Sequence, residues 1–141
     1  MNPNELMIGD WVLYKREPYQ IRELGIYGVN RDGEDYPAVC IGKSTGIGLI
    51  VERNKIKPIS LTPEILEKNG FSHIMYSDAY YSIMIGDTYV ELRKYENMAV
   101  WFNWEENNDG VYADYILPMP EFVHQLQHAL RICGVGKEIE L

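Results

Sequence analysis

Hydrophobic and polar residues alternate in short runs along most of the chain. Five such runs in residues 1–60 predict strands, at residues 11–14, 19–24 with a possible extension to 29, 38–41, 49–53 and 55–59. Alternation with period two is typical of half-buried strands, and links rich in glycine and aspartate are typical of hairpins. The front of the chain therefore predicts a small, curled β-barrel of the SH3-like kind.

Residues 61–71, L-T-P-E-I-L-E-K-N-G-F, have the sequence features of a short helix with a defined beginning and end. Thr62 can cap the first turn, and Pro63 suits the first helical position because no N–H is missed there. Gly70 can adopt the left-handed conformation that ends a helix, with Phe71 packing back onto Leu66. This helix separates the two strand-rich parts of the chain.

The back of the chain predicts an antiparallel meander followed by a helix. Strands are expected at residues 72–76, 79–85, 88–95, 98–104 and 111–117, and their short links favour hairpins over parallel crossovers. After two prolines, a stripe with helical period follows at Phe122, Leu126, Ala129, Leu130 and Cys133, and Gly134 ends it. The fold class is α+β, mostly β, with a barrel module at residues 1–60 and a second module at residues 61–141.

Charge is distributed unevenly between these two modules. Residues 1–60 contain eight Lys/Arg and eight Asp/Glu, whereas the remaining five basic and thirteen acidic residues give the back module the whole net charge of −8. An acidic surface repels a phosphate backbone. A role in nucleic-acid binding would therefore have to use the front module.

Three blocks of sequence carry a resemblance to a known family. They are L-M-I-G-D-W-V at residues 6–12, I-S-L-T-P-E-I-L-E-K-N-G-F at residues 59–71 and V-H-Q-L-Q-H-A-L-R-I-C-G-V at residues 123–135. In order and spacing they resemble a family of small, uncharacterised bacterial proteins of gut anaerobes and their mobile elements. The family has no established activity, so the resemblance implies a bacterial, cytoplasmic protein and carries over no site.

Cysteine usage and hydropathy also indicate the cytoplasm. Cys40 and Cys133 lie far apart and have no metal-type spacing, so two reduced thiols are expected. The first residues lack the basic and apolar regions of a signal peptide, and no apolar run has membrane-spanning length. We expect no membrane association and no cofactor.

His124 and His128 form the sharpest candidate for chemistry, because two histidines at i and i+4 on a helix can bind one zinc ion. Gln125 stands where the metalloprotease motif has its catalytic glutamate, and only a distant third ligand such as His73 is available. Both histidines fall roughly opposite the apolar stripe. A solvated helix face is therefore the favoured interpretation, and a metal-dependent hydrolase is an unlikely alternative.

Two other segments resemble ion or phosphate sites only in part. The sequence G-K-S-T at residues 42–45 lacks the earlier glycine of a phosphate-binding loop, and glycines at 46 and 48 disfavour a following helix, so a hairpin turn is expected. The sequence E-E-N-N-D-G at residues 105–110 resembles half of a calcium loop, but Ile116 stands at the position of the final acidic ligand. A solvated acidic turn is the better interpretation.

Eleven tyrosines and three tryptophans are many for 141 residues. Aromatic side chains on a sheet can anchor a protein interface or stack on bases, although most aromatics serve the core. The aromatic residues of the back module that we expect at the surface are Tyr80, Tyr81, Tyr89, Trp101, Tyr112 and Tyr115.

The sequence therefore favours a non-enzymatic accessory or interaction protein, whose aromatic, acidic back sheet binds another protein or a second copy of the chain. A basic partner surface and salt-sensitive association would follow. The main alternative is nucleic-acid binding by the front module through its basic residues, which are Lys15, Arg16, Arg22, Lys43, Arg53, Lys55 and Lys57. Clustering of these residues on one face would favour that alternative.

Overall fold

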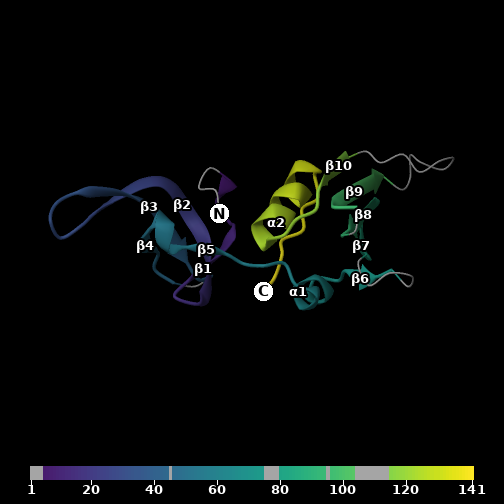
Figure 1. Ribbon diagram of the computed structural model, residues 1–141, viewed down its shortest axis with the longest axis horizontal. Helices are drawn as coiled ribbons and strands as arrows, with labels where there is room; N and C mark the ends of the chain where they lie inside the picture. Colours follow the sequence, from purple (N-terminus) through teal and green to yellow (C-terminus); the bar gives the residue numbers. More distant parts are fainter. Residues whose placement is uncertain (1–4, 45, 75–79, 95, 104–114) are drawn as a thin grey trace. The chain divides into compact units, whose positions relative to one another are not determined.

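The computed structural model describes residues 5–44, 46–74, 80–94, 96–103 and 115–141, with the side chains of residues 80, 101–103 and 115 left out of the description. The chain divides into two compact units, Met1–Ile59 and Ser60–Leu141, each built on one five-stranded antiparallel sheet. Figure 1 shows both sheets, and the helices α1 and α2 belong to the second unit. The fold is α+β and mostly β, as the sequence predicts.

The first unit contains every strand predicted for residues 1–60. Its elements are β1 (Trp11–Tyr14), β2 (Glu17–Val29), β3 (Asp35–Gly42), β4 (Leu49–Glu52), the short 3-10 helix η2 (Arg53–Lys55) and β5 (Lys57–Pro58). The strand order is β4-β3-β2-β1-β5, so β4 and β5 are the two edges of the sheet. The sheet is not closed, and the predicted barrel is therefore not confirmed.

The long strand β2 is irregular in its middle. Its pairing with β3 shifts register between Ile21 and Glu23 and again between Glu23 and Ile26, and Gly25 has a φ of 72°. Extra residues of this kind bend a strand and increase its twist. The two halves of β2 can thus run in different directions, and in Figure 1 the β2–β3 hairpin curves away from the rest of its sheet.

The core of the first unit comes from alternate positions of its strands. Val12, Ile21, Val39 and Ile41 are at most 1% exposed, and Ile21 pairs directly with Ile41 across the sheet. Leu6, Val51 and Ile56 complete this cluster. Val39 and Ile41 are two positions apart, as the period-two geometry of a strand with one buried face requires.

The second unit has the predicted order of helix, meander and helix. Its elements are α1 (Pro63–Lys68), β6 (Ser72–His73), β7 (Tyr80–Ile85), β8 (Thr88–Arg93), β9 (Met98–Asn103), β10 (Tyr115–Pro118) and α2 (Val123–Ile132). The strands pair in chain order, β10-β9-β8-β7-β6, and all pairs are antiparallel.

Helix α1 begins and ends as its sequence predicts. The Thr62 hydroxyl accepts a hydrogen bond from the Ile65 N–H, and Gly70 has a φ of 84°. The Phe71 N–H donates to the Leu66 carbonyl at 3.0 Å, which is the backbone bond of a glycine-terminated helix. Leu66 and Phe71 are both buried, so their predicted contact closes the end of the helix against the core.

Helix α2 ends in the same way. Gly134 has a φ of 73°, and the Val135 N–H donates to the Leu130 carbonyl at 2.8 Å. The predicted stripe is buried at Leu126, Ala129 and Leu130. This stripe faces the interior of the second unit.

One face of the second sheet forms that interior. Tyr81, Leu92 and Ala99 lie opposite one another on β7, β8 and β9, and all three are buried. A Cβ placed on Gly70 would lie 3.5 Å from the Ile83 side chain of the same face, which locates the end of α1 there. Helix α1 therefore lies on the face to which Tyr81 belongs.

Candidate functional site

The aromatic residues predicted to form a binding surface do not all reach the surface. Tyr81 is 6% exposed, so the prediction for this residue is wrong. It lies on the covered sheet face, where its ring centroid is 4.2 Å from that of His73. Tyr89 in β8 is half-buried. Outside the described residues lie the side chains of Tyr80, Trp101 and Tyr115 and the whole of Tyr112.

Charged groups on the back sheet pair with one another. The Arg93 guanidinium contacts the Glu91 carboxylate at 3.0 Å and the Glu96 carboxylate at 3.3 Å. These hydrogen bonds, that with Glu91 above all, hold the pKa of Arg93 above its ordinary value. Two of the acidic groups of the back module are therefore already occupied, which weakens their attraction for a basic partner.

His124 does not lie on a solvated helix face. It is 1% exposed, and its ring stacks on that of Phe122 with a centroid distance of 5.8 Å, so the expected surface position is wrong. The ring of His128 meets it edge-on at 5.8 Å. Gln127 is also buried, so the buried surface of α2 is wider than the apolar stripe that the sequence predicts. In the described part of the chain, no group of three metal-ligating side chains accompanies these histidines.

Gln125, which replaces the metalloprotease glutamate, has a structural role at the start of α2. Its side-chain oxygen accepts hydrogen bonds from the backbone N–H of Glu121 at 2.9 Å and of Phe122 at 3.2 Å. Free N–H groups at a helix start require such acceptors. Gln125 thus has a capping role at the helix start, and His124 and Gln127 are packed in the interior.

The glycine-rich segment after Gly42 is the link between β3 and β4, as expected of a hairpin turn. The Arg22 guanidinium donates to the carbonyls of Lys43 and Gly46, the latter at 2.7 Å. A phosphate site needs converging N–H groups, whereas here carbonyl oxygens converge on a cation. The phosphate-binding alternative is therefore disfavoured. The calcium-loop candidate at residues 105–110 lies outside the described residues.

Several basic groups of the first unit already have partners. Lys43 pairs with Glu17 at 2.8 Å, Lys55 pairs with Glu52, and Arg22 is engaged with the β3–β4 link. The pair with Lys43 lowers the pKa of Glu17 and raises that of Lys43. Lys15 and Arg16 lie together in the turn between β1 and β2, and neither forms an ion pair within the described residues.

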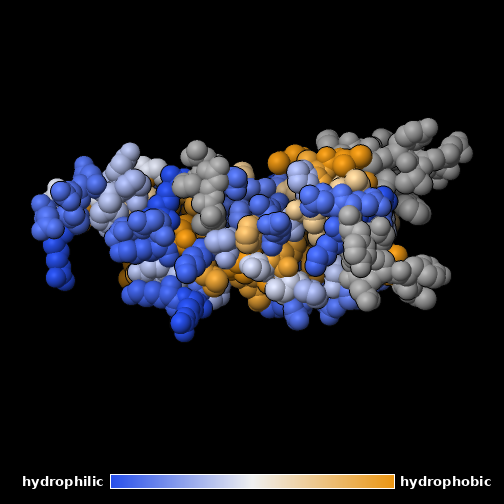
Figure 2. Space-filling view, in the orientation of Figure 1, coloured by the Kyte–Doolittle hydropathy of each residue, from blue (hydrophilic) through white to orange (hydrophobic). Residues whose placement is uncertain are grey.

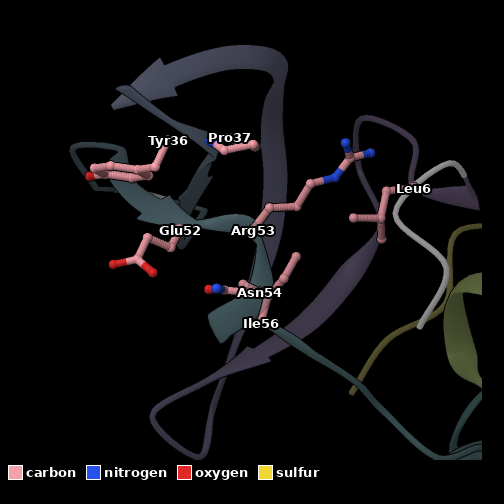
Figure 3. A pocket seen from close by; sticks show the side chains of 7 residues that line it. All are labelled: Leu6, Tyr36, Pro37, Glu52, Arg53, Asn54 and Ile56. Atoms are coloured by element: carbon pink, nitrogen blue, oxygen red, sulfur yellow. The ribbon is translucent and has the colours of Figure 1, made fainter. Parts of the chain in front are cut away.

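A hollow of about 530 Å³ opens beside η2 in the first unit. Figure 3 shows Arg53 reaching across it toward Leu6, while the Glu52 carboxylate points to the other side beside Tyr36. Asn54, Pro37 and Ile56 complete the lining. This mixture offers one cation and a largely apolar wall, and it contains no nucleophile with an adjacent base.

The edge strand β4 and Ile47, two positions before it, expose apolar side chains. Ile47 is 95% exposed, Ile50 60% and Leu49 45%. These three residues are called the β4 edge below. Strand β4 pairs with β3 through Cys40↔Ile50 and Ile41↔Leu49, so one side of its backbone has no strand partner among the described residues. An apolar edge without lysine or proline is a ready template for another strand.

A second apolar patch lies on the other unit. Figure 2 shows apolar colouring gathered over the end of α2 and β10, where Ile132 is 69% and Ile116 63% exposed. A shallow hollow of about 250 Å³ beside it is lined by residues that include Leu117, Met119 and His128. This patch provides a competing position for an interface.

Sequence reasoning missed the two features of the first unit that stand out in the structure. The β4 edge carried a usable signal, because L-I-V at residues 49–51 has no charged or proline residue to protect an edge. The Lys15–Arg16 turn carried none, because Lys-Arg is not a recognised hairpin dipeptide. Both features depend on which strands pair, which the pattern alone does not give.

The geometry thus defines a mostly β protein of two antiparallel sheets with exposed, apolar and cationic surface features. No family model, curated protein or solved structure matches the chain. In the part of the chain that the structure describes, no helix combines the length and apolar character needed to cross a bilayer.

Proposed function

We propose that the protein is a non-enzymatic interaction protein and that its binding element is the β4 edge. The observation that carries this proposal is the exposure of Leu49 and Ile50 in β4 and of Ile47 just before it, at a strand that pairs on one side only among the described residues. When an extended segment adds to the sheet, burial of the exposed apolar side chains and pairing of the free backbone groups both lower the free energy. The sequence-based proposal of an aromatic back-sheet interface becomes one alternative, and the apolar patch at Ile116 and Ile132 is another.

The proposed partner is an extended, uncharged segment of a different protein. Glu52 is the only charged residue of β4, and its carboxylate is paired with Lys55, so the edge presents no net charge to an incoming strand. Leu49 and Ile50 point to opposite faces of the sheet, so the partner strand needs apolar groups on both faces. A second copy is disfavoured because each copy carries a net charge of −8.

Hydrogen exchange with a model strand tests the binding mode. The probe is the six-residue peptide Val-Val-Thr-Thr-Val-Val, which has valine on both faces of an extended strand, and the control is the same peptide N-methylated at alternate residues. Slower exchange of the Leu49–Glu52 amides with the first peptide, but not the second, would support strand addition. Unchanged exchange with both peptides at millimolar concentration would overturn it.

Matched variants test the position of the surface. Proteins captured from host lysate after nuclease treatment are compared for the wild type, Leu49→Lys/Ile50→Lys, Tyr27→Lys and Ile132→Lys. Tyr27 is a control because it is 71% exposed on β2, away from β4. We expect a stoichiometric partner to be lost only with the double variant. Loss of the partner protein with Ile132→Lys alone would place the interface on the second unit. A dimer of the wild type in sedimentation velocity would indicate self-association in place of a different partner protein.

We also propose that the first unit is an open relative of the SH3-like barrel. Its strand order, the bent β2 and the helix η2 between β4 and β5 support this assignment. A module of this kind should fold by itself. A dispersed amide spectrum and a cooperative melt for residues 1–59 expressed alone would agree, whereas an unfolded fragment would argue against separate modules.

Localisation in the cytoplasm of a bacterium, and membership of the family that the three sequence blocks resemble, remain proposals. The free thiols Cys40 and Cys133 support a reducing compartment. Fractionation of a tagged chain in its host tests the location, and recovery outside the cytoplasmic fraction would contradict it.

A further inference from the structure

The turn between β1 and β2 holds two cationic residues in an unfavourable backbone conformation. Tyr14 pairs with Glu17, so the loop has only two residues, and Lys15 and Arg16 have φ angles of 51° and 70°. This is the geometry of a type I′ hairpin turn, in which Asn-Gly is the favoured dipeptide. Left-handed backbone is costly for residues with a Cβ. A turn that carries Lys-Arg in this position gives up stability for two exposed positive charges.

Two aromatic rings lie beside this turn. The Tyr14 and Tyr19 rings meet edge-on with centroids 6.2 Å apart, and both residues are half-buried against the core of the first unit. The Lys15 ammonium lies 5.3 Å from the Tyr14 centroid, and the Lys43 ammonium lies 5.3 Å from the Tyr19 centroid. The rings are thus held in place by packing, and the cations lie over them.

The charge of this cluster is only partly neutralised. Glu17 pairs with Lys43 at 2.8 Å, and its carboxylate also accepts from the Tyr19 hydroxyl at 3.2 Å. Within the described residues, Lys15 and Arg16 make no ion pair, and both are exposed. Two positive charges therefore remain available beside a fixed aromatic surface. We call Tyr14, Lys15, Arg16, Tyr19 and Lys43 the basic corner.

We propose that the basic corner binds an acidic peptide segment of a partner protein. Lys15 and Arg16 would pair with two of its carboxylates, and the guanidinium fork suits a carboxylate in particular. The tyrosine rings would receive the peptide backbone and the aliphatic parts of its side chains. The basic corner shares no residue with the β4 edge, and this proposal does not depend on the function proposed for that edge.

The size of the charge favours a peptide over nucleic acid. Proteins that bind nucleic acid commonly neutralise roughly six to ten phosphates, whereas this corner offers two unpaired cations. The net charge of −8 also repels a long polyanion more strongly than a short segment. An acidic stretch of a few residues matches the corner in both respects.

The double variant Lys15→Asn/Arg16→Gly separates binding from folding. Asn-Gly relieves the strained turn, so the variant should melt at a higher temperature than the wild type. The probe is a fluorescein-labelled hexaglutamate peptide, measured by anisotropy at low salt. We expect the wild type to bind it, hexaglutamine to bind at least tenfold more weakly, and the variant to lose at least tenfold in affinity despite its greater stability.

A control variant removes the same charge elsewhere. Arg31→Gln/Lys94→Gln deletes two exposed cations, one at the far end of β2 and one in the second unit. This control should keep the affinity of the wild type within about twofold. An equal loss of affinity for hexaglutamate in the control would show that only net charge matters, and it would overturn the proposal.

Three further outcomes would also overturn it. They are no binding of hexaglutamate by the wild type, undiminished binding by Lys15→Asn/Arg16→Gly, and preferential binding of a thymidine hexanucleotide, which would assign the corner to nucleic acid. The swapped variant Lys15→Arg/Arg16→Lys keeps both charges. Binding of hexaglutamate by this variant with wild-type affinity would support the proposal.

Discussion

Asn69, at the end of α1, forms two hydrogen bonds with the backbone of Glu140, a residue 71 positions later. Its side-chain amide donates to the Glu140 carbonyl, and its side-chain oxygen accepts from the Glu140 N–H, both at 2.8 Å. The same amide donates to the Ile65 carbonyl at 2.8 Å. Asn69 is 4% exposed, and the neighbouring Ile139 is 2% exposed. One side chain therefore joins the end of a helix to the last residues of the chain.

Substitution of Asn69 by alanine should destabilise the second unit. The change leaves the N–H and the carbonyl of Glu140 without their partner, and lost hydrogen bonds of this kind cost about 1–3 kcal/mol. We expect a loss of about 3 kcal/mol in the free energy of unfolding by urea titration. The exposed Asn54→Ala is the control and should stay within about 0.5 kcal/mol of the wild type. Equal stability of the two variants would contradict the role of Asn69.

Gln125 offers a test of capping against metal binding. Gln125→Ala removes the acceptor for two N–H groups and should cost about 1 kcal/mol of stability, as loss of a helix cap does. Gln125→Glu keeps an acceptor, adds a negative charge at the helix start and should retain or raise the melting temperature. Glutamate would also complete the metalloprotease pattern. Zinc binding by Gln125→Glu in isothermal titration would contradict the structural interpretation of His124 and His128.

Gly28 in β2 gives room to the Tyr36 ring of β3. A Cβ at Gly28 would lie 2.2 Å from Cζ of Tyr36, so Gly28→Ala must displace the ring. We expect a loss of about 1 kcal/mol in the wild-type background. In a Tyr36→Ala background the same change should become neutral or stabilising, because alanine is better than glycine in a strand by roughly 0.5–1 kcal/mol. Additive effects of the two substitutions would show that the ring does not depend on the glycine.

The ion pair of Glu17 and Lys43 predicts a pH dependence at the base of the β2–β3 hairpin. Hydrogen bonding to Lys43 lowers the pKa of Glu17 from its ordinary 4.5. The contribution of the carboxylate is therefore complete above pH 4.5 and is lost as the pH falls through the lowered pKa. The raised pKa of Lys43 means that the contribution of the ammonium is lost only above pH 10.5.

Carbon-detected NMR titration of the Glu17 carboxyl measures this effect. Lys43→Met should return the pKa of Glu17 toward 4.5, whereas Lys57→Met, which leaves the pair intact, should not move it. Because both groups are exposed, salt should weaken the shift. A titration of Glu17 unchanged by Lys43→Met would exclude the pair in solution.

The sequence alone determined the local structure. Thr62, Gly70 and Gly134 act through neighbours within one helical turn, so their effect on helix ends is readable from the chain. The alternation within residues 11–14, 19–24, 38–41 and 49–53 likewise identified strands, because side-chain direction repeats every two residues. These features depend on residues that are close in sequence and not on the rest of the fold.

Only the tertiary structure decided which of those residues meet and which remain exposed. The burial of His124 and Tyr81 and the exposure of Ile47 and Ile50 follow from what covers each element, and covering groups come from distant parts of the chain. Closure of the first sheet into a barrel is also decided by tertiary structure, because it would require the two edge strands, β4 and β5, to pair with each other. The alternation of the sequence gives each side chain a direction, but only packing decides what covers it. The functions proposed for the β4 edge and the basic corner rest on side chains that packing leaves exposed.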